Sequence, residues 1–290
     1  MKSLLQTALL LTFLSPFISF GQYDTKKVME MINSGSESEL VMESSIMIQE
    51  GYFYQAGMIV DKLLEFQPNS SNYNYRRGFI YLEMSTDFVK ATPYLEKAVL
   101  KTDKKYDPFN TKETAAPVDA YFEMGRCYHM AGNIDKAEEF YNKFLANSIT
   151  KSNNVFFAKL YLEQCKIARA EMQNPKNVYL KNMGSSINTA NPEFSPVISL
   201  DGSALYYTSR RRWPTGASDR GLDPRNNQYP EDIYVSYRDF DSTWMDPIKL
   251  EFCDSLQNEA TLAVSPDERR VYVYQDRSEE RRVGKECRSR

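Results

Sequence analysis

The chain has 290 residues, which is enough for about two domains. Hydrophobic residues make up 42% and charged residues 26%, as in a globular protein rather than a disordered or collagen-like one. The formal net charge of −3 argues against nucleic acid as the main partner, because that role needs a strongly positive surface. His129 is the single histidine, so catalytic sites that need two imidazoles and histidine-rich metal sites are excluded.

Residues 1–21 have the features of a secretory signal peptide. Lys2 supplies a positive start, residues 4–20 are mostly apolar, and small residues precede Gln22. We therefore expect export through the Sec pathway and cleavage near Gly21. The alternative is a buried N-terminal helix. Polar residues and a proline interrupt the apolar stretch, and no later segment has the length for a transmembrane span.

The basic C-terminal segment, residues 277–290, differs in composition from the rest of the chain. Six basic and three acidic residues surround one isolated valine. The segment resembles the in-frame translation of a sequencing adapter, and we expect the natural protein to continue differently after Asp276. The alternative is a natural basic tail. The cysteines before it, Cys127, Cys165 and Cys253, are odd in number and widely spaced, which predicts no disulfide framework.

Small residues recur at a nearly constant interval in the first half of the chain. The recurring positions are Ser44, Gly78 and Gly125, and also Ala56, Ala91 and Ala137. Ser44 and Gly78 are 34 residues apart, and Ala56 and Ala91 are 35 apart. The next interval, from Ala91 to Ala137, is 46 residues, and the polar stretch 101–117 accounts for the excess. Each unit predicts two antiparallel helices that approach closely at these small side chains.

Local signals mark the ends of the predicted helices. Ser36 followed by Glu39 predicts a capping box at a helix N-terminus. Pro68 predicts the end of the first unit. Residues 153–173 form one further amphipathic helix, suited to capping a stack of helical hairpins. We expect its packing face to carry Phe157, Leu160, Leu162 and Ile167.

Over residues 24–174 this pattern resembles the tetratricopeptide repeat (TPR) family. The third unit matches the family's signature spacings at Tyr121, Met124, Gly125, Tyr128, Ala137, Tyr141 and Phe144. The second unit has one residue inserted before Ala91, and the first has Ser44 in place of glycine. The resemblance implies an all-α superhelix whose inner groove holds a peptide or a partner helix. It assigns the packing signature to Ser44, Ala56, Gly78, Ala91, Gly125, Tyr128 and Ala137.

If the resemblance holds, the first helix of each hairpin lines that groove. The residues then expected on the inner side are Tyr75, Arg76, Phe79, Phe122, Arg126 and His129. Aromatic and arginine side chains are favoured at binding surfaces, so these six are the candidate contacts for a protein or peptide partner. The alternative is that Phe79 and Phe122 pack between repeats and the others are solvated.

After Pro175 the sequence has the alternation of β-strands. Residues 197–200 and 205–208, joined by a turn at Asp201-Gly202, predict a β-hairpin. Residues 233–237 and 248–250 predict two further strands. The segment Glu193–Gly202 recurs as Glu259–Glu268, displaced by 66 residues, and Tyr206 maps onto Tyr272.

A Ser-x-Asp-Gly turn before an aromatic strand resembles the WD40-like (PD40, TolB-type) β-propeller repeat, over residues 176–276. Glu268 replaces the turn glycine in the second copy. Because a left-handed turn position tolerates glutamate poorly, we expect that hairpin to use a different turn. The predicted fold class is therefore a multidomain α + β protein: an all-α TPR superhelix followed by an incomplete all-β propeller of about one blade and a fragment.

Motifs of catalysis and cofactor binding are missing from the sequence outside residues 277–290. It has no Gly-x-Ser-x-Gly elbow, phosphate loop, Cys-x-x-Cys pair or His-Glu-x-x-His motif there. We expect a non-enzymatic protein without a metal or cofactor.

The order of signal peptide, TPR units and propeller resembles multidomain envelope proteins of Bacteroidota. The resemblance implies a periplasmic, cell-envelope scaffold that grips a partner protein, with relatives in type IX secretion. It also implies a further C-terminal OmpA-family domain that binds peptidoglycan. The alternative is the N-terminal part of a serine peptidase, because WD40-like propellers also precede hydrolase domains.

Overall fold

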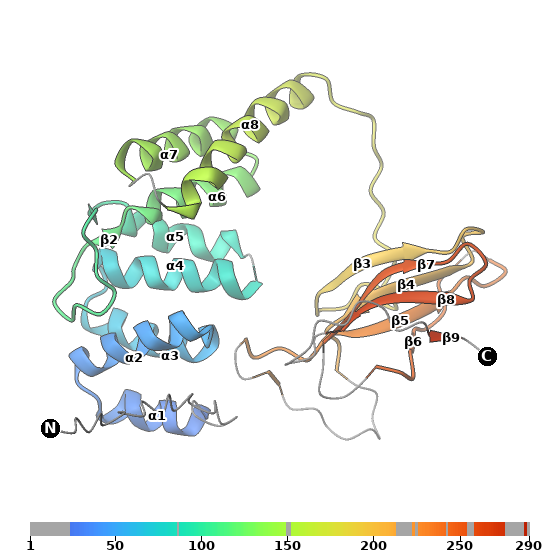
Figure 1. The fold of residues 1–290 in the computed structure, drawn as a ribbon, viewed down its shortest axis with the longest axis horizontal. Helices are drawn as coiled ribbons and strands as arrows, with labels where there is room; N and C mark the ends of the chain where they lie inside the picture. Colours follow the sequence, from blue (N-terminus) through green and yellow to red (C-terminus); the bar gives the residue numbers. More distant parts are fainter. Residues whose placement is uncertain are drawn as a thin grey trace, which may run out of the picture.

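The computed structural model describes two regions of different secondary structure, helical and then β-stranded (Figure 1). The described residues are 24–85, 87–148, 152–212, 222–223, 226–241, 243–253 and 258–275, with the backbone of 287–288. The predicted signal peptide and most of the basic C-terminal segment lie outside them. An extended segment joins the two regions after Gln173 (Figure 1).

The first region is a stack of helical hairpins. The part of the chain that the structure describes contains eight helices: α1 (Thr25–Ser34), α2 (Glu37–Glu50), α3 (Phe53–Phe66), α4 (Ser71–Ser85), α5 (Phe88–Ala98), α6 (Asp119–Met130), α7 (Ile134–Asn147) and α8 (Asn153–Gln173). The pairs α2–α3, α4–α5 and α6–α7 form hairpins in chain order, and α8 packs on the last one (Figure 1). A TPR-like helical region is thus confirmed. None of these described helices combines the length and apolarity needed to cross a bilayer.

Helix ends follow the local sequence signals. Glu39 Oε2 accepts a hydrogen bond from Ser36 N at 2.8 Å, and Ser36 Oγ accepts from Glu39 N at 3.4 Å. These two bonds form the predicted capping box at the start of α2. Helix α3 ends at Phe66, just before Pro68, and α8 has the predicted bounds.

Small residues lie where the helices of a hairpin cross. A Cβ atom on Gly78 would lie 2.6 Å from Leu95 Cγ, and one on Gly125 would lie 2.6 Å from the Tyr141 ring. Ala91 and Ala137, on the second helices, are fully buried. The recurring small residues therefore mark contacts between helices that only small side chains allow.

Helix α8 packs on the third hairpin through a different face from the one that the sequence suggested. Ala158 and Cys165 are fully buried there. Phe157 is 42% exposed and Ile167 63% exposed, so most of the apolar residues assigned to the packing face point elsewhere. The α7 surface is lined by bulky side chains such as Phe144, and small residues on α8 let the two helices approach.

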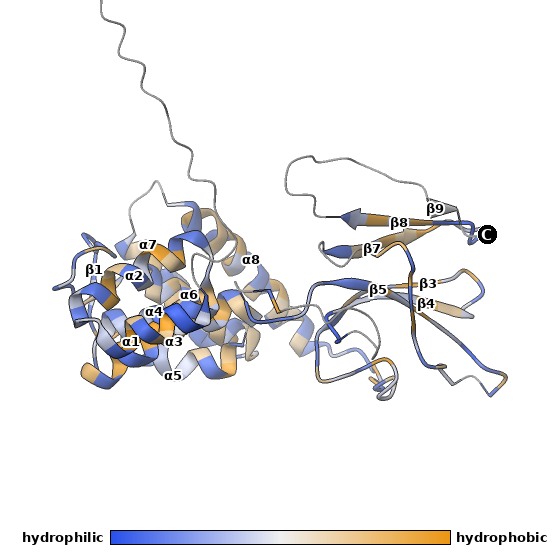
Figure 2. Cartoon of the chain, turned by 90° about the horizontal axis from the view of Figure 1, so that it is seen from below, coloured by the Kyte–Doolittle hydropathy of each residue, from blue (hydrophilic) through white to orange (hydrophobic). Residues whose placement is uncertain are grey.

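The second region consists of two antiparallel sheets. The strands are β3 (Glu193–Ile198), β4 (Ala204–Ser209), β5 (Asp232–Tyr237) and β6 (Ile248–Lys249) in the first sheet, and β7 (Glu259–Val264), β8 (Arg270–Gln275) and β9 (Cys287–Arg288) in the second. The first sheet contains the four predicted strands, paired in chain order. Strand β7 contacts β3, β4 and β5, and the sheets form two layers (Figure 2). The described strands do not close into a ring.

The 66-residue sequence repeat is also a structural repeat. In β3 the pairing register with β4 shifts between Phe194 and Val197, and in β7 the register with β8 shifts between Thr261 and Ala263. Each pair of strands then ends in a turn of the same construction. Ser199 Oγ accepts from Ala204 N at 2.9 Å, and Ser265 Oγ accepts from Arg270 N at 3.0 Å.

Glu268 adopts the left-handed conformation, with φ 57°, where Gly202 has φ 74°. The expectation that the second hairpin uses a different turn is therefore wrong. Asp267 Oδ1 accepts from Arg269 N at 3.2 Å, as Asp201 Oδ1 accepts from Ser203 N at 2.8 Å. These side-chain bonds impose the same turn in both copies, and the glutamate backbone is held in a strained region.

Replacing Glu268 with glycine should stabilise the β7–β8 hairpin by about 1 kcal/mol, because glycine adopts a positive φ without steric cost. Urea unfolding followed by tryptophan fluorescence measures this, since both tryptophans of the sequence lie in the second half of the chain. Gly202→Ala is the matched control and should destabilise by a similar amount. If Glu268→Gly and the unmodified protein had the same free energy of unfolding, the claim that Glu268 is strained would be contradicted.

Candidate partner-binding face

Side chains connect each first helix of a hairpin to the first helix of the next. Arg76 on α4 donates to α2, and Arg126 on α6 lies 3.6 Å from Glu83 on α4. Asn154 on α8 donates to Asp119 Oδ1 on α6 at 2.7 Å. We call the surface formed by α2, α4, α6 and α8 along these contacts the inner face, since it contains all six candidate contacts.

Arg76 is buried, with 2% of its surface exposed. Its guanidinium donates to Val41 O at 3.0 Å, to Ser44 Oγ at 2.8 Å and to Ser45 Oγ at 2.7 Å, all on α2. It also donates to Pro108 O at 2.7 Å, in the polar stretch 101–117. The expectation that Arg76 lies open to a partner is not met, because residues 101–117 of the chain itself cover the guanidinium.

Phe122 is also buried, at 4% exposure, and the packing alternative holds for it. Its ring stacks on Tyr161 of α8, with centroids 5.9 Å apart and planes 12° apart. It also contacts Phe144 at 5.5 Å. Phe122 therefore joins the third hairpin to α8, and its assignment as a partner contact is wrong.

Tyr75 and Phe79 form a half-buried stacked pair of rings along α4. Their ring centroids are 5.9 Å apart, and Phe79 makes an edge contact with Phe53 at 6.2 Å. Tyr75 makes a second edge contact with Tyr106 at 6.3 Å. Both side chains thus lie on the inner face, where Tyr106 covers part of Tyr75.

Arg126 and His129 are half-buried on α6, near α8. Arg126 pairs with Glu123 at 2.7 Å. The His129 ring makes an edge contact with Tyr161 at 6.1 Å, and its Nδ1 lies 3.4 Å from Tyr141 Oη. Next to them Phe157 contacts Tyr161 at 6.2 Å. This end of the inner face presents aromatic edges beside a paired cation.

Burial dominates the electrostatics of the inner face. Glu123 is almost fully buried, and this raises the pKa of its carboxyl to about 7, although the Arg126 charge opposes the shift. Burial lowers the pKa of His129, so its imidazole is neutral over more of the physiological pH range.

The raised Glu123 pKa predicts a pH-dependent stability. The folded state holds this proton more tightly than the unfolded state, so the carboxyl costs stability as pH rises from about 4.5 to about 7. The full cost is about 3 kcal/mol, from a difference of about 2.5 pKa units. Thermal unfolding of the unmodified protein and Glu123→Gln should give a stability difference that shifts in favour of the variant between pH 5 and pH 8. A constant difference would contradict the raised pKa. His129 is present in both proteins, so its opposite contribution cancels.

Three features of the inner face escaped the sequence analysis. Tyr161 and Phe157 were assigned to a capping helix, although α8 continues the series of first helices. Glu123 lies three residues before Arg126, a helical ion-pair spacing that could have revealed it. The polar stretch 101–117 was treated as a spacer, yet Asn72 and Arg76 of α4 both bind it.

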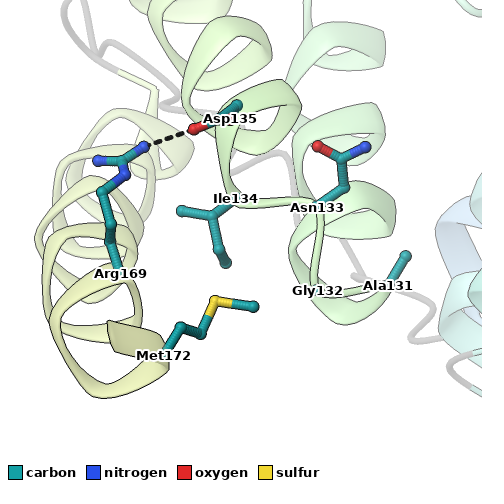
Figure 3. A pocket seen from close by; sticks show the side chains of 7 residues that line it. All are labelled: Ala131, Gly132, Asn133, Ile134, Asp135, Arg169 and Met172. Atoms are coloured by element: carbon teal, nitrogen blue, oxygen red, sulfur yellow. Dashed lines mark hydrogen bonds and ion pairs between the residues drawn. The ribbon is translucent and has the colours of Figure 1, made fainter. Parts of the chain in front are cut away.

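A surface hollow of about 440 Å³ lies outside the inner face, at the turn between α6 and α7 (Figure 3). Its single cationic side chain, Arg169, lies 2.8 Å from both Asp135 Oδ1 and Glu138 Oε2. The positive charge of Arg169 is therefore already taken up by two carboxylates of the chain, and the described residues that line the hollow include no free cation for an anionic ligand.

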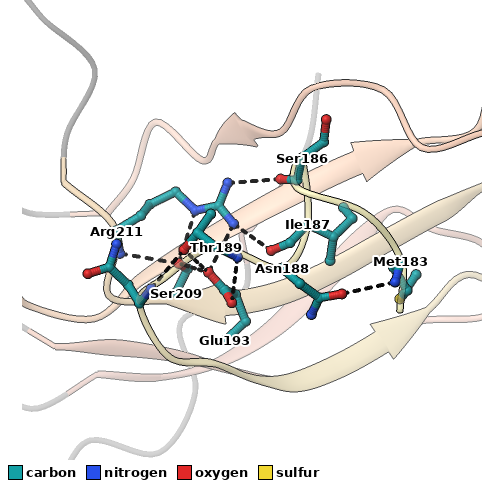
Figure 4. Close-up of polar contacts among 9 residues, drawn as sticks. Met183, Ser186, Ile187, Asn188, Thr189, Glu193, Ser209 and Arg211 are labelled. Atoms are coloured by element: carbon teal, nitrogen blue, oxygen red, sulfur yellow. Dashed lines mark hydrogen bonds and ion pairs between the residues drawn. The ribbon is translucent and has the colours of Figure 1, made fainter. Parts of the chain in front are cut away.

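The sheet region has two polar clusters that serve its own structure. The Arg211 guanidinium donates to Ser186 O at 3.1 Å and to Ile187 O at 2.9 Å, and it lies 3.4 Å from Glu193 Oε1 (Figure 4). It lies 4.8 Å from the centre of the Tyr234 ring. Arg211 thus fixes the segment before β3 onto the sheet.

The other cluster contains the buried side chains Asp232, Cys253 and Glu259, whose potential ligand atoms lie within 4.8 Å of one another. The Lys249 ammonium lies 3.0 Å from Asp232 Oδ1. Because this ammonium already supplies a positive charge, the cluster fits a buried ion-pair network better than a metal site.

Comparison with known proteins gives similarity among solved structures alone. No protein-family model matches the chain, and no curated protein sequence does. The first TPR domain of human RPAP3 is 17% identical and aligns over 47% of this chain and 94% of its own, with a TM-score of 0.35. The Sgt2 TPR domain from Aspergillus fumigatus is 18% identical over 50% of this chain and 87% of its own, with a TM-score of 0.36. The first TPR of Spaghetti (RPAP3), bound to the HSP90 peptide SRMEEVD, is 16% identical over 51% of this chain and 96% of its own, with a TM-score of 0.35.

Proposed function

We propose that the chain is a non-enzymatic scaffold that binds a segment of a partner protein on the inner face, between α6 and α8. The observation that carries this proposal is the accessible aromatic side chain of Phe157, which is 42% exposed and contacts Tyr161. Tyr161 in turn contacts His129, one turn after Arg126 on α6. Exposed aromatic rings next to an arginine are typical of the residues that dominate protein interfaces. A TPR-like stack of hairpins provides a rigid support for such a surface.

The charges at this end favour a partner segment with a basic residue. Arg126 is already paired with Glu123, and the carboxylates of Glu83 and Asp119 lie on the same face. The net charge of this end is therefore negative, and complementary charge mainly raises the rate and specificity of association. A suitable segment combines an apolar side chain, packed on Phe157, with a nearby lysine or arginine.

Phe157→Ala tests the proposal, with Phe156→Ala as its matched control. Both residues are exposed aromatics in the first turns of α8, and Phe156 is 68% exposed. Quantitative cross-linking in an envelope extract should show partners that are lost with Phe157→Ala and kept with Phe156→Ala. Equal partner recovery by the two variants would contradict the proposal. Arg126 is a poorer probe, because its replacement leaves the buried Glu123 carboxylate without its 2.7 Å partner.

We further propose that this scaffold is periplasmic, anchored to peptidoglycan in the full-length protein and linked to type IX secretion. The support is the apolar segment 1–21 and the order of the regions along the chain. Cell fractionation tests the location, and mass spectrometry of the mature N-terminus should find Gln22 as the first residue. Recovery of the uncleaved chain from the cytoplasm would contradict it. The reading frame beyond Asp276 should encode an OmpA-like domain, whereas a hydrolase domain would favour the peptidase alternative.

We also propose that the sheet region is the start of a WD40-like propeller. The support is the structural repeat: two hairpins, 66 residues apart, share the same bulge and the same Ser-x-Asp turn. A longer natural sequence should continue this repeat at similar spacing, and a sequence without further Ser-x-Asp turns would contradict the proposal.

A further inference from the structure

The polar stretch 101–117 lies across the first helices of the first two hairpins. Tyr106 Oη donates to Asn72 Oδ1 at 2.8 Å, and its ring packs edge-on against Tyr75. Two residues later, Pro108 O accepts from Arg76 at 2.7 Å and lies 2.5 Å from Ser45 Oγ. Side chains of α2 and α4 thus hold this segment on the inner face.

Asn72 also holds the returning part of the segment. Its Nδ2 donates to Glu113 O at 3.0 Å, and its backbone N–H donates to Thr114 O at 3.3 Å. Apart from the Tyr106 hydroxyl, the groups bound in this way are backbone carbonyls. Binding through main-chain carbonyls places few demands on the sequence of the bound segment, which here is built of short turns at residues 104–105, 108–109 and 111–112.

Residues 103–112 of the segment form a surface layer, whereas Ala115 and Ala116 at its end belong to the core. Residues 103–105, 107–110 and 112 are exposed, and Phe109 is 37% exposed. Its base is closed by a short parallel pairing of β1 (Thr102–Asp103) with β2 (Ala116–Pro117). Beneath it, Arg76 is 2% exposed, and its hydrogen bonds to α2 and to Pro108 all go to neutral oxygen atoms. The helices therefore provide the binding groups, and the segment occupies them.

We propose that Asn72, Tyr75, Arg76 and Ser45 form a second peptide-binding site, which residues 104–113 of the chain's own segment occupy and close. When these residues leave, the site takes a segment of a partner that folds into similar turns, with a tyrosine followed two residues later by a carbonyl that faces α2 and α4. This inference rests on the proposed function in treating the inner face as a binding surface. It uses α2 and α4, however, and not the α6–α8 end.

The proposal can be tested by removing the segment from the protein and offering it back as a free peptide. Residues 104–113 are replaced by a short glycine-serine linker between β1 and Thr114. The probe is a fluorescently labelled synthetic peptide of residues 104–113, measured by anisotropy. The shortened protein should bind it at least about tenfold more tightly than the intact protein, where the resident segment competes at a millimolar effective concentration. Asn72→Ala in the shortened protein, or phenylalanine in place of Tyr106 in the peptide, should weaken this binding several-fold.

A folded shortened protein that binds no peptide at millimolar concentration overturns the proposal. If the shortened protein does not fold, limited trypsin digestion of the intact protein tests the proposal instead. The expected cleavage sites in the segment are Lys104, Lys105 and Lys112. Cleavage should proceed by local opening, with a weak dependence on urea and with the helical circular dichroism retained. Cleavage that requires global unfolding overturns the proposal. Phe157→Ala should leave the peptide binding unchanged, so failure at the α6–α8 end remains distinguishable.

Discussion

Replacement of Phe122 by alanine should lower the free energy of unfolding of the helical region by about 3–5 kcal/mol, the usual cost of removing a buried aromatic ring. Phe122 is 4% exposed and contacts Tyr141, Phe144 and Tyr161, so the cavity would open between the third hairpin and α8. Urea unfolding followed by far-ultraviolet circular dichroism measures the loss.

Phe157→Ala is the control for this loss. Its ring is 42% exposed, so the same truncation should cost less than about 1 kcal/mol. A similar loss of stability in Phe122→Ala and Phe157→Ala would show that the difference in burial between the two rings does not determine the cost of removing them. The pair also separates stability from binding, because partner capture should fall with Phe157→Ala while the fold stays intact.

Gly125→Ala should destabilise the helical region by about 1–3 kcal/mol, although alanine favours helix formation over glycine by about 1 kcal/mol. The added methyl group would lie 2.6 Å from two atoms of the Tyr141 ring. Tyr141 is fully buried and cannot move away without shifting its helix. Thermal unfolding should therefore show a lower midpoint than in the unmodified protein.

Gly57→Ala is the matched substitution at a buried helical glycine that faces the end of a side chain and not a ring. Its methyl group would come within 2.8 Å of Arg77 Nη1, the end of a long side chain that can shift along its ion pair with Asp61. The helical propensity then dominates, and this variant should be neutral or stabilised by up to about 1 kcal/mol. Equal effects of Gly57→Ala and Gly125→Ala would contradict the assignment of Gly125 to a close helix contact.

The helical region could be predicted because its signals are local and periodic. Gly78 and Gly125 lie opposite Leu95 and Tyr141, and the short interval between the partners makes each crossing visible in the sequence. The capping box at Ser36 is likewise contained within four consecutive residues. Such features depend on helix geometry alone.

The errors at the candidate site have a different origin. Helical rotation places Arg76 on the face where α4 meets α2, but its burial depends on Pro108, 32 residues away in a segment without periodicity. The stacking of Phe122 on Tyr161 depends on the rotation of α8, which small buried residues such as Ala158 determine. Long-range contacts of this kind leave no local pattern to detect.

The Glu268 turn shows the limit of a rule based on one residue. Glutamate disfavours a positive φ, yet Ser265 and Asp267 form the same hydrogen bonds as their counterparts in the first copy. Several bonds of about 1 kcal/mol each offset a conformational cost of similar size. The pattern of the whole turn was therefore a better guide than the glycine alone.

The parallel pairing of β1 with β2 isolates the segment between them from the helix crossings. Insertions or deletions in that segment change its closure entropy only slowly with length. Evolution can therefore vary the exposed residues of this segment, such as Lys104 and Lys112, while Tyr106 and Pro108 keep their contacts with α2 and α4. New ligand preferences arise there at little cost in folding, because the two ends of the segment stay fixed.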